Sequence, residues 1–584
     1  MTIPHVSGRC RPSSRRSGAM PLVVGRGAAR RSGATPFVAH RRATLSVVPL
    51  VVLALAACAG DKSPSDGNNN NNGGDQDTVT VSVHVNVATD QERTPISPLV
   101  YGSNQDYTGV KWTIRRLGGN RLTGYNWENN FSNAGADYIH SSDTFMLSVM
   151  GLSDADSVNA GTVLTHFHDQ SLAMGAASII TVPVAGYVSA DNKGAVSVAE
   201  TAPSARWVKV LPHKPTAFAL TPDKTDGTVY VDEEVNFLVS RYGLAGSARG
   251  VGFYSLDNEP AIWPGTHPRI HPSPTGAREL TDRDIAAASA VKGADPQAQL
   301  TGPAEYGFSG YLSCQDAPDW NTVKGSSRWY LDYYLDQFRT AGQTAGKRLL
   351  DVLDVHWYPE AQGDHRITDS NATTVTDQDA RMQAPRSLWD STYTEKSWIA
   401  QYFRSFLPIL PSLQQSIAGH YPGTKLGITE YNYGGGADPS GGLAQADVLG
   451  AFGKYGVYLA TLWGLGSSDT YIAAAFKLYR DYDGQGAAYG ATAVRATTDD
   501  VAKTSTYAAM DDAGHLHVIV LNKTRAPIGI RFHVDSPASF ARADVWGFDG
   551  TSPAITHRTA VSKVTSNEFS YSVPALAALH LILQ

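Results

Sequence analysis

Short apolar runs alternate with amphipathic stretches from about residue 98 to residue 466. The apolar runs have the length and composition of buried strands, and they predict strands at 113–117, 177–184, 252–256, 299–304, 352–357, 426–430 and 458–463. The stretches between them predict helices that include 231–242, 283–292, 329–341, 395–406 and 445–455. Repeated strand-helix alternation predicts a parallel sheet, and at this length it favours a closed (β/α)8 barrel over an open sheet.

The two ends of the chain follow a period-2 pattern instead. Every second residue from Val79 to Val87 is valine, which is typical of a half-buried strand. After about Ala475, short runs rich in β-branched and aromatic residues predict strands at 506–510, 515–522, 529–534, 543–548 and 568–573. We therefore expect an α/β protein with a (β/α)8 TIM barrel over 96–474 and a smaller all-β sandwich over 475–584. We expect the strand within 78–95 to join that sandwich.

The first 58 residues have the features of an export signal. They contain nine arginines and no acidic residue, and residues 45–57 form a 13-residue apolar stretch, too short to span a bilayer. That stretch ends in Leu-Ala-Ala-Cys58, which resembles a bacterial lipobox, whose cysteine is lipidated. We expect an exported protein that Cys58 anchors to the cell envelope, with a plain secretory signal as the alternative. Residues 59–77 predict a flexible linker because they contain almost no apolar side chain.

Composition and charge narrow the range of partners. The 584 residues include 27 Tyr and 11 Trp with only 17% charged residues, and such aromatic side chains suit the faces of sugars. Loss of the nine arginines would lower the formal net charge from −6 to −15, which disfavours nucleic acid and acidic polysaccharides and leaves neutral glycans open. Only Cys314 would remain beyond Cys58, so no internal disulfide is expected, and we expect a monomer.

Two predicted strands end in a carboxylate. Glu259 follows 252–256 in the sequence Asp-Asn-Glu-Pro, and Glu430 ends 426–430 in Thr-Glu-Tyr. Barrel enzymes build their sites at the carboxyl ends of the strands, and cleavage of a glycosidic bond needs two carboxyl groups. Counted along the chain, the two glutamates fall near the fourth and seventh strands, from which they can face each other. At a separation of about 5 to 5.5 Å, Glu430 would be the nucleophile and Glu259 the general acid/base of a retaining mechanism.

A glutamate at a strand end is more often a salt-bridge partner than a catalyst. The Asn258-Glu259-Pro260 sequence favours catalysis, because the asparagine can bond a sugar hydroxyl and the proline fixes the turn from strand to loop. A glucan cleft also needs aromatic platforms and polar groups. The candidate substrate-binding residues lie at predicted strand ends and in loops: Asn120, Trp127, Asn258, His356, Tyr358, Trp389, Trp398 and Trp463.

Six motifs follow one another along the chain: Tyr101-Gly-Ser-Asn-Gln-Asp-Tyr, Arg116-Leu-Gly-Gly-Asn-Arg-Leu-Thr-Gly-Tyr-Asn-Trp-Glu-Asn-Asn, Tyr254-Ser-Leu-Asp-Asn-Glu-Pro-Ala-Ile-Trp, Thr266-His-Pro-Arg-Ile-His-Pro, Asp354-Val-His-Trp-Tyr-Pro and Ile428-Thr-Glu-Tyr-Asn. Together these motifs resemble glycoside hydrolase family 44. The resemblance implies a barrel with a β-sandwich, endo-action on β-1,4-glucans such as xyloglucan and carboxymethyl cellulose, and retention. It places the acid/base on Glu259 and the nucleophile on Glu430.

Three questions stay open at this point. The substrate polymer could instead be mannan or xylan, and a surface glycan-binding lipoprotein with a degenerate barrel is a further alternative that the two intact glutamates disfavour. No cofactor is expected for the chemistry. The resemblance raises the prospect of a structural calcium on the oxygen-rich segment that contains Asp223, Asp226 and Asp232, although solvated loop acids are the simpler interpretation.

Overall fold

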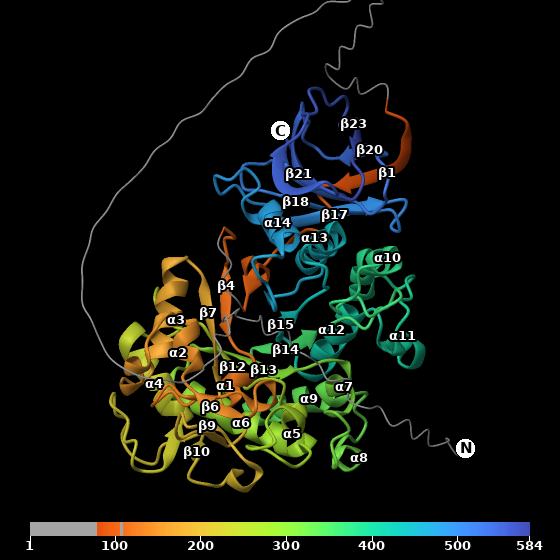
Figure 1. Ribbon diagram of the computed structural model, residues 1–584. Helices are drawn as coiled ribbons and strands as arrows, with labels where there is room; N and C mark the ends of the chain where they lie inside the picture. The colour runs from red at the N-terminus through yellow and green to blue at the C-terminus, as the bar shows by residue number, and fades with distance from the viewer. Residues whose placement is uncertain (1–78, 105–108) are drawn as a thin grey trace, which may run out of the picture. The chain divides into compact units, whose positions relative to one another are not determined.

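The computed structural model describes residues 79–104 and 109–584 (Figure 1). The predicted export segment, Cys58 and the linker therefore lie outside the described residues. Among the described helices, none combines the length and the apolar character needed to cross a membrane.

Eight parallel strands close into a barrel. In chain order they are β3 (Gly102–Ser103), β4 (Ile114–Leu117), β7 (Ala177–Val182), β12 (Phe253–Leu256), β13 (Gln299–Glu305), β14 (Val352–Trp357), β15 (Lys425–Tyr431) and β16 (Leu459–Leu462). The barrel closes where Thr461 of β16 pairs with Gly102 of β3. Glu259 follows the fourth strand and Glu430 lies on the seventh, so the predicted barrel is confirmed with both glutamates at the expected strands.

Helices connect these strands and surround the barrel (Figure 1). They are α1 (Asn120–Thr123), α2 (Phe145–Val149), α3 (Thr162–Ala173), α4 (Val231–Tyr242), α5 (Trp263–Thr266), α6 (Ala277–Ala294), α7 (Phe308–Ser313), α8 (Trp320–Val323), α9 (Tyr330–Ala345), α10 (Val375–Gln383), α11 (Trp398–Tyr402), α12 (Ile409–His420), α13 (Pro439–Lys454) and α14 (Thr470–Arg480). Two small sheets interrupt the alternation before β12: β5 (Ser132–Asn133) with β6 (Ser141–Asp143) and β9 (Gly194–Ala195), and β8 (Tyr187–Ser189) with β10 (Trp207–Leu211) and β11 (Thr228–Tyr230).

A curled ten-stranded sheet forms the second domain. Its strands are β1 (Val81–Ala88), β2 (Thr94–Pro95), β17 (Thr492–Thr498), β18 (Thr504–Met510), β19 (Leu516–Asn522), β20 (Ile528–Asp535), β21 (Ala543–Asp549), β22 (Ser552–His557), β23 (Glu568–Val573) and β24 (Ala577–Leu583). The N-terminal strand β1 lies between β17 and β20, antiparallel to the first and parallel to the second. Valines of β1 share one hydrophobic core with β19, β20 and β24, so the curled sheet encloses a sandwich core.

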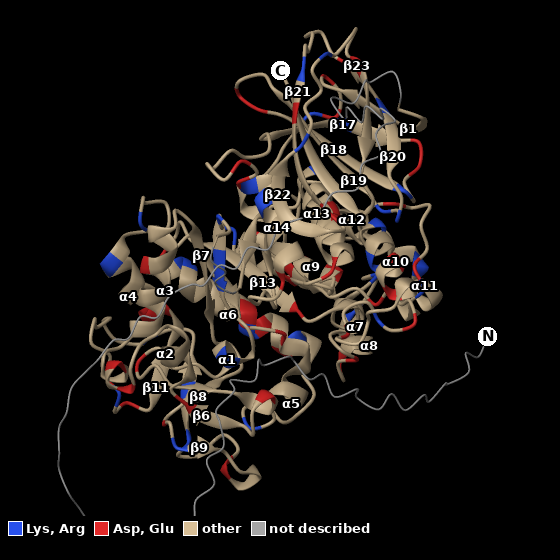
Figure 2. Cartoon of the chain, turned by 45° about the horizontal axis from the view of Figure 1, so that its top comes forward, with Lys and Arg blue, Asp and Glu red and all other residues tan. Residues whose placement is uncertain are grey.

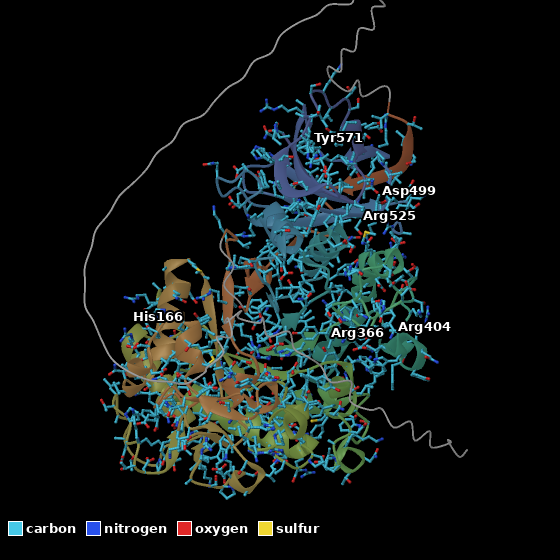
Figure 3. The ribbon with its side chains drawn as sticks, viewed as in Figure 1. His166, Arg366, Arg404, Asp499, Arg525 and Tyr571 are labelled. Carbon is cyan, nitrogen blue, oxygen red and sulfur yellow. The ribbon has the colours of Figure 1, made fainter. Side chains whose placement is uncertain are left out.

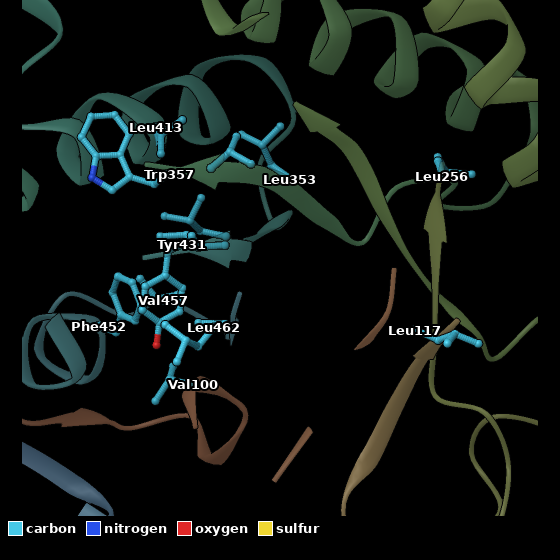
Figure 4. Close-up of a cluster of buried hydrophobic side chains, with 14 of the residues drawn as sticks. Val100, Leu117, Leu256, Leu353, Trp357, Leu413, Tyr431, Phe452, Val457 and Leu462 are labelled. Carbon is cyan, nitrogen blue, oxygen red and sulfur yellow. The ribbon is translucent and has the colours of Figure 1, made fainter. Parts of the chain in front are cut away.

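Both faces of β19 and β24 are buried. Val518 and Leu579 point into the sandwich core, whereas Ile519 and Ala578 belong to the larger core of the barrel and its helices. Consecutive residues of each strand point into different cores because side chains alternate between the two faces of a strand. In the barrel core, the ring of Tyr431 on β15 packs edge-on against Phe452 of α13 with centroids 5.2 Å apart (Figure 4). The sandwich therefore packs on the barrel through apolar side chains.

Three sequence predictions about elements need correction. The first barrel strand, β3, has only two residues and left no periodic pattern to detect. The predicted helix 395–406 is two short pieces, α11 and a 3-10 turn at Arg404–Phe406. The boundary at Ala475 falls inside α14, and the sandwich sheet resumes only at β17. Helix α14 is buried along most of its length, and the sequence analysis assigned no helix to it.

Charged residues of both signs are spread over the barrel and the sandwich (Figure 2). Arg525, labelled in Figure 3, extends from the sandwich to the barrel, where it pairs with Asp379 and donates to the side-chain oxygen of Gln378 at 3.0 Å. Acidic residues are therefore not concentrated in one place, and the carboxylates considered below are distinguished by their position at the carboxyl ends of barrel strands.

Candidate active site

The carboxyl ends of the barrel strands bring Glu259 and Glu430 together. Each offers a carboxylate oxygen, and these oxygens and a ring nitrogen of His356 all lie within 4.8 Å of one another. His356 is on β14, where it is the register partner of Glu430 on β15. Glu259 is 9% exposed and Glu430 is 4% exposed, so both carboxyl groups are largely shielded from water. The two side chains that the sequence singled out thus share one small space.

Glu259 is held by an unusual backbone. Its φ of 47° and ψ of 51° are left-handed, as is the φ of 58° at Asp257. Such values are uncommon for residues other than glycine and cluster at functional sites. The buried carboxylate of Asp257 accepts bonds from the hydroxyl of Thr123 at 2.6 Å and from the amides of Val184 at 2.5 Å and Ala185 at 3.1 Å. These bonds fix the turn that carries Glu259.

Glu430 is held by one side chain from β4 and one from the residue that directly follows β14. Arg116 of β4 donates to Oε1 at 2.8 Å, and the hydroxyl of Tyr358 donates to Oε2 at 2.8 Å. The same guanidinium donates to Oδ1 of Asn258 at 2.9 Å and to Oδ1 of Asn104 at 3.2 Å. Because Arg116 is fully buried, this ion pair is shielded from solvent and orients the Glu430 carboxylate firmly.

His356 and Tyr358 are both uncharged near neutral pH. Burial lowers the pKa of His356 to about 4, against the raising effect of Glu430. Burial raises the pKa of Tyr358 well above its ordinary range, and the charge of Glu430 raises it further. Nδ1 of His356 lies 3.0 Å from Oε1 of Glu259 and 3.5 Å from Oε2 of Glu430. The pocket therefore contains one cation, Arg116, set against two carboxyl groups.

Three more of the predicted substrate-binding residues, Asn120, Trp398 and Trp463, lie at or near the carboxyl ends of the barrel strands. Asn120 accepts from Asn258 at 3.2 Å and donates to Asp137 at 3.0 Å, which extends the hydrogen-bond network outward. Trp463 directly follows β16, is partly exposed, and lies over Gly119. Trp398 begins α11 and packs edge-on against Phe308 at 5.8 Å, leaving part of its side chain exposed.

Two of the predicted tryptophans are placed differently. Trp127 is fully buried and its ring packs 5.3 Å from that of Phe237 on α4, so it cannot offer a face to a sugar. Trp389 stacks on Tyr455 at 5.9 Å. Tyr455 precedes β16, so this pair lies toward the amino ends of the strands, opposite the glutamates. Both rings are packing residues, because partners distant in sequence cover them.

Arg116, Asn104 and Asp257 were not assigned a role from the sequence, although their contacts define the site. Arg116 was read as part of the strand 113–117. An arginine pair inside a short apolar strand is a signal that could have identified it, because a buried charge needs a partner. Asn104 and Asp257 gave no comparable signal.

The three aspartates considered for calcium do not gather. Asp223 accepts from Thr225 and Asp226 from the amide of Thr228, while Asp232 is buried and accepts from the amide of Lys214. In the part of the chain that the structure describes, the one group of three or more candidate ligands within 4.8 Å is Glu259, His356 and Glu430. The geometry thus does not fit a single ion shared by Asp223, Asp226 and Asp232.

Comparisons with known proteins agree with this architecture. A sequence model of glycoside hydrolase family 44 matches residues 131–361. Endoglucanase A of Paenibacillus lautus is 52% identical over 503 residues, which are 85% of this chain and 72% of that protein. Beta-mannanase/endoglucanase A of Caldicellulosiruptor saccharolyticus is 47% identical over 84% of this chain, which spans only 38% of that protein. The structure of a Paenibacillus polymyxa xyloglucanase from family 44 is 50% identical to this chain and matches it with a TM-score of 0.85. The match covers 86% of this chain and 100% of that one, and the Paenibacillus polymyxa enzyme has also been solved with xyloglucan. The chain belongs to glycoside hydrolase family 44.

Proposed function

We propose that this protein is a retaining endo-glycoside hydrolase that cleaves β-1,4-glucan backbones, with Glu259 as general acid/base and Glu430 as nucleophile. The observation that carries the proposal is the separation of at most 4.8 Å between an oxygen of each carboxyl group. Retaining enzymes place the two carboxyls about 5 to 5.5 Å apart, whereas inverting enzymes leave about 6.5 to 9.5 Å for a water molecule. The close spacing favours direct attack by a carboxylate.

The reaction would proceed by double displacement. Glu430 attacks the anomeric carbon while Glu259 gives its proton to the departing glycosidic oxygen, which leaves a glycosyl ester on Glu430. A water molecule then gives its proton to Glu259 and attacks the same carbon, and the ester bond to Glu430 breaks. Both steps invert the anomeric centre, so the product retains the starting configuration.

The contacts around the carboxylates support these roles. Arg116 and Tyr358 each donate to a different oxygen of Glu430, which aligns the carboxylate for attack. Asn258 is tethered to Arg116 and to Asn120, and its position beside Glu259 suits a bond to the sugar 2-hydroxyl. His356 is neutral and lies beside Glu259, so it adds no charge that would compete for the proton.

Glucan is the substrate that the relatives favour. The Paenibacillus lautus and Paenibacillus polymyxa proteins are named an endoglucanase and a xyloglucanase. Mannan and xylan are the alternatives, since one relative carries the name beta-mannanase/endoglucanase and a 30% identical structure is described as a bifunctional glucanase-xylanase. On the surface of this chain, Trp463, Trp398 and the 68% exposed Tyr402 of α11 are the aromatic candidates for sugar faces.

The test of the catalytic pair uses isosteric substitutions. Glu259→Gln and Glu430→Gln should each lower the hydrolysis of xyloglucan and carboxymethyl cellulose by several orders of magnitude, on the order of 10⁴-fold or more. Glu568→Gln, the same change at an exposed sandwich position, should keep full activity. Proton NMR of the first product should show the β-anomer. A fully active Glu259 or Glu430 variant, or α-anomer as the initial product, would contradict the assignment.

A polysaccharide panel with product sizing separates the substrate alternatives. Xyloglucan, carboxymethyl cellulose, mannan and xylan are compared at equal mass, and the products are sized early in the reaction. We expect a range of oligosaccharides from glucans, as endo-action gives, and much slower release from mannan and xylan. Faster hydrolysis of mannan or xylan would change the assigned substrate to that polymer and leave the proposed mechanism unchanged.

We further infer export with a lipid anchor at Cys58, on the basis of the arginine-rich start and the Leu-Ala-Ala-Cys sequence. The full chain should incorporate labelled palmitate and partition into detergent, and Cys58→Ala should do neither. Absence of label in the wild type would leave a plain secretory signal as the explanation, whereas label in the Cys58→Ala variant would show that the lipid is attached at another residue.

A further inference from the structure

The strand that carries Glu430 contains a bulge directly before this residue. In the register between β14 and β15, Thr429 is an extra residue: Ile428 and Glu430 on either side of it pair with consecutive residues of β14. Such a bulge re-aims the side chain beside it and is common next to active sites. The direction of the Glu430 side chain therefore depends on the contacts that hold Thr429.

Side chains supply partners for both backbone groups of Thr429, which is 0% exposed. Its amide donates to Oδ1 of Asp354 at 3.2 Å, and its hydroxyl donates to the same carboxylate at 2.8 Å. Its carbonyl accepts from Nδ2 of Asn104 at 2.8 Å and from the hydroxyl of Thr461 at 2.5 Å. A buried backbone group needs such a partner, so these contacts fix the bulge from two sides.

Asn104 lies where the barrel closes. It directly follows β3, a strand of two residues between β16 and β4. The paired residues of β15 and β16 end directly before Thr429 and Thr461. At this level Nδ2 of Asn104 also donates to the carbonyls of Thr461 at 3.2 Å and Leu462 at 3.1 Å. One side-chain amide thus joins the ends of β3, β15 and β16 beside the nucleophile.

The oxygen of the same amide contacts Arg116. Nη1 of Arg116 donates to Oδ1 of Asn104 at 3.2 Å and to Oε1 of Glu430 at 2.8 Å. An amide oxygen accepts and an amide nitrogen donates, so one orientation of the Asn104 side chain satisfies both sides. A carboxylate would place an oxygen against the Thr429 carbonyl, and an apolar side chain would leave both sides without this partner. A neutral amide meets both requirements.

We propose that Asn104 is a positioning residue for Glu430: its nitrogen holds the Thr429 bulge, its oxygen holds the Arg116 guanidinium, and together they set the position of the attacking carboxylate. Its effect passes through Thr429 and Arg116, because these residues and not Asn104 adjoin the nucleophile. A misplacement of about 1 Å in a reacting group can lower the rate by about 100-fold. The inference rests on the proposed role of Glu430 as the nucleophile.

The test is the kinetics of Asn104→Ala on a soluble xyloglucan oligosaccharide. The change removes both contacts and adds no charge, so kcat per folded molecule should fall by about 100-fold. KM should stay within about threefold of the wild-type value, because the change acts on the attack and not on the binding of the sugar. Thermal unfolding gives the folded fraction. A kcat within about threefold of wild type would overturn the proposal.

Asn522 of β19, in the sandwich, provides a matched control. It is 0% exposed, its Nδ2 donates to three backbone carbonyls at 2.7 to 3.2 Å, and its oxygen accepts from a backbone amide at 2.9 Å. Asn522→Ala removes a comparable set of bonds, so it should lower the unfolding temperature and keep kcat and KM. An equal fall of kcat in both variants would mean that the loss of any bridging amide produces the effect, which contradicts a specific link to Glu430.

A substrate that needs no acid shows which carboxyl group is affected. Dinitrophenolate leaves without protonation, so kcat/KM for dinitrophenyl β-cellotrioside depends on the attack by Glu430 and not on the proton of Glu259. Asn104→Ala should therefore lose about as much kcat/KM on this substrate as on the oligosaccharide, whereas Glu259→Gln should lose far less. A normal kcat/KM of Asn104→Ala on the aryl substrate would show that Asn104 does not act on the nucleophile.

A second variant covers the case in which Asn104→Ala does not fold. Asn104→Ser has one short hydroxyl, which cannot reach Thr429 and Arg116 together, so the same fall of kcat at similar KM is expected. A folded Asn104→Ser variant with the kcat of the wild type would equally overturn the proposal.

The outcomes separate this inference from the proposed function. Near-normal activity of Glu430→Gln would remove the nucleophile assignment itself. An inactive Glu430→Gln together with a normal kcat of Asn104→Ala would leave the proposed function in place and reject only the role of Asn104.

Discussion

Arg116 connects the strand ends that carry the two halves of the candidate site. Its guanidinium bonds Glu430 through one nitrogen and Asn258 through the other, a geometry that only a planar fork provides. Arg116→Lys keeps the charge but cannot reach both partners, so kcat/KM should fall by about 100-fold or more. Steady-state kinetics on xyloglucan measure this, with Arg339→Lys on exposed α9 as the control. Activity within a few-fold of wild type would mean that charge alone suffices.

Gly119 supports Trp463. Its φ of +85° strains any other residue, and a Cβ there would lie 2.4 Å from the indole ring. Gly119→Ala should displace the ring, raise KM for xyloglucan several-fold and change kcat less. Gly151→Ala is the matched control, because Gly151 has a φ of +71° and nothing within 4 Å. Both substitutions then carry a similar backbone cost of about 1 kcal/mol, and they differ only in the contact with Trp463. Equal KM values in the two variants would exclude Trp463 as a sugar platform.

For single residues, the sequence was enough to predict a location in the fold where that location depends on one strand alone. Glu259 and Glu430 each follow an apolar run, so their place at the barrel mouth could be inferred without the rest of the fold. Trp127 and Trp389 could not be placed in this way, because Phe237 and Tyr455, which cover them, come from other elements. Whether an aromatic ring is a platform or a packing residue depends on tertiary neighbours.

Among the elements, helix α13 occupies the boundary between barrel and sandwich. Nearly all of its residues are buried, including Asp447, whose carboxylate pairs with Lys523 of the sandwich at 2.6 Å. Tyr507 and Ser505 of β18 also donate to it. The amphipathic pattern of α13 is weak for the same reason, because a helix covered on both sides has no polar face. The short strand β3 was missed because two residues cannot establish a period.

Asp447→Asn should destabilise the protein by about 3 to 5 kcal/mol, because it leaves the ammonium of Lys523 buried without a counter-charge. Denaturant unfolding followed by tryptophan fluorescence measures the change. The double variant Asp447→Leu with Lys523→Met removes both charges and should recover much of the loss. An unfolding midpoint of Asp447→Asn equal to that of the wild type would show that the pair contributes nothing to the boundary.

For the whole molecule, two buried histidines link the sandwich to the barrel. His580 of β24 lies 3.0 Å from the carbonyl of Leu478 on α14, and its other nitrogen lies 2.8 Å from His517 of β19. Burial, and then the neighbouring His517, lowers the pKa of His580 well below its ordinary value. Burial also lowers the pKa of His517. Both rings are therefore neutral in the folded protein at neutral pH.

The sign of the resulting pH dependence follows from proton binding. In the unfolded chain these histidines titrate near pH 6.5, so below that pH the unfolded chain binds more protons than the folded one. The contribution of these histidines to the free energy of unfolding should be constant above about pH 6.5 and should fall as the pH drops below that value, and the lowered pKa values of His356 and His267 act in the same direction. The raised pKa values of the buried Glu128 and Glu234 act in the opposite direction, so the effect of one histidine is measured as a difference between variants. Denaturant unfolding at pH 7.5, 6 and 5 measures this slope.

His580→Asn removes one of these titrations and keeps a donor for the Leu478 carbonyl. Its slope between pH 6.5 and 5 should be smaller than that of the wild type by up to about 1.4 kcal/mol per pH unit, the effect of one proton. His533→Asn, at an exposed position of β20, should leave the slope unchanged. If His580→Asn and wild type lose stability in parallel, the acid sensitivity arises elsewhere, and the contact between β24 and α14 is held by its apolar neighbours alone.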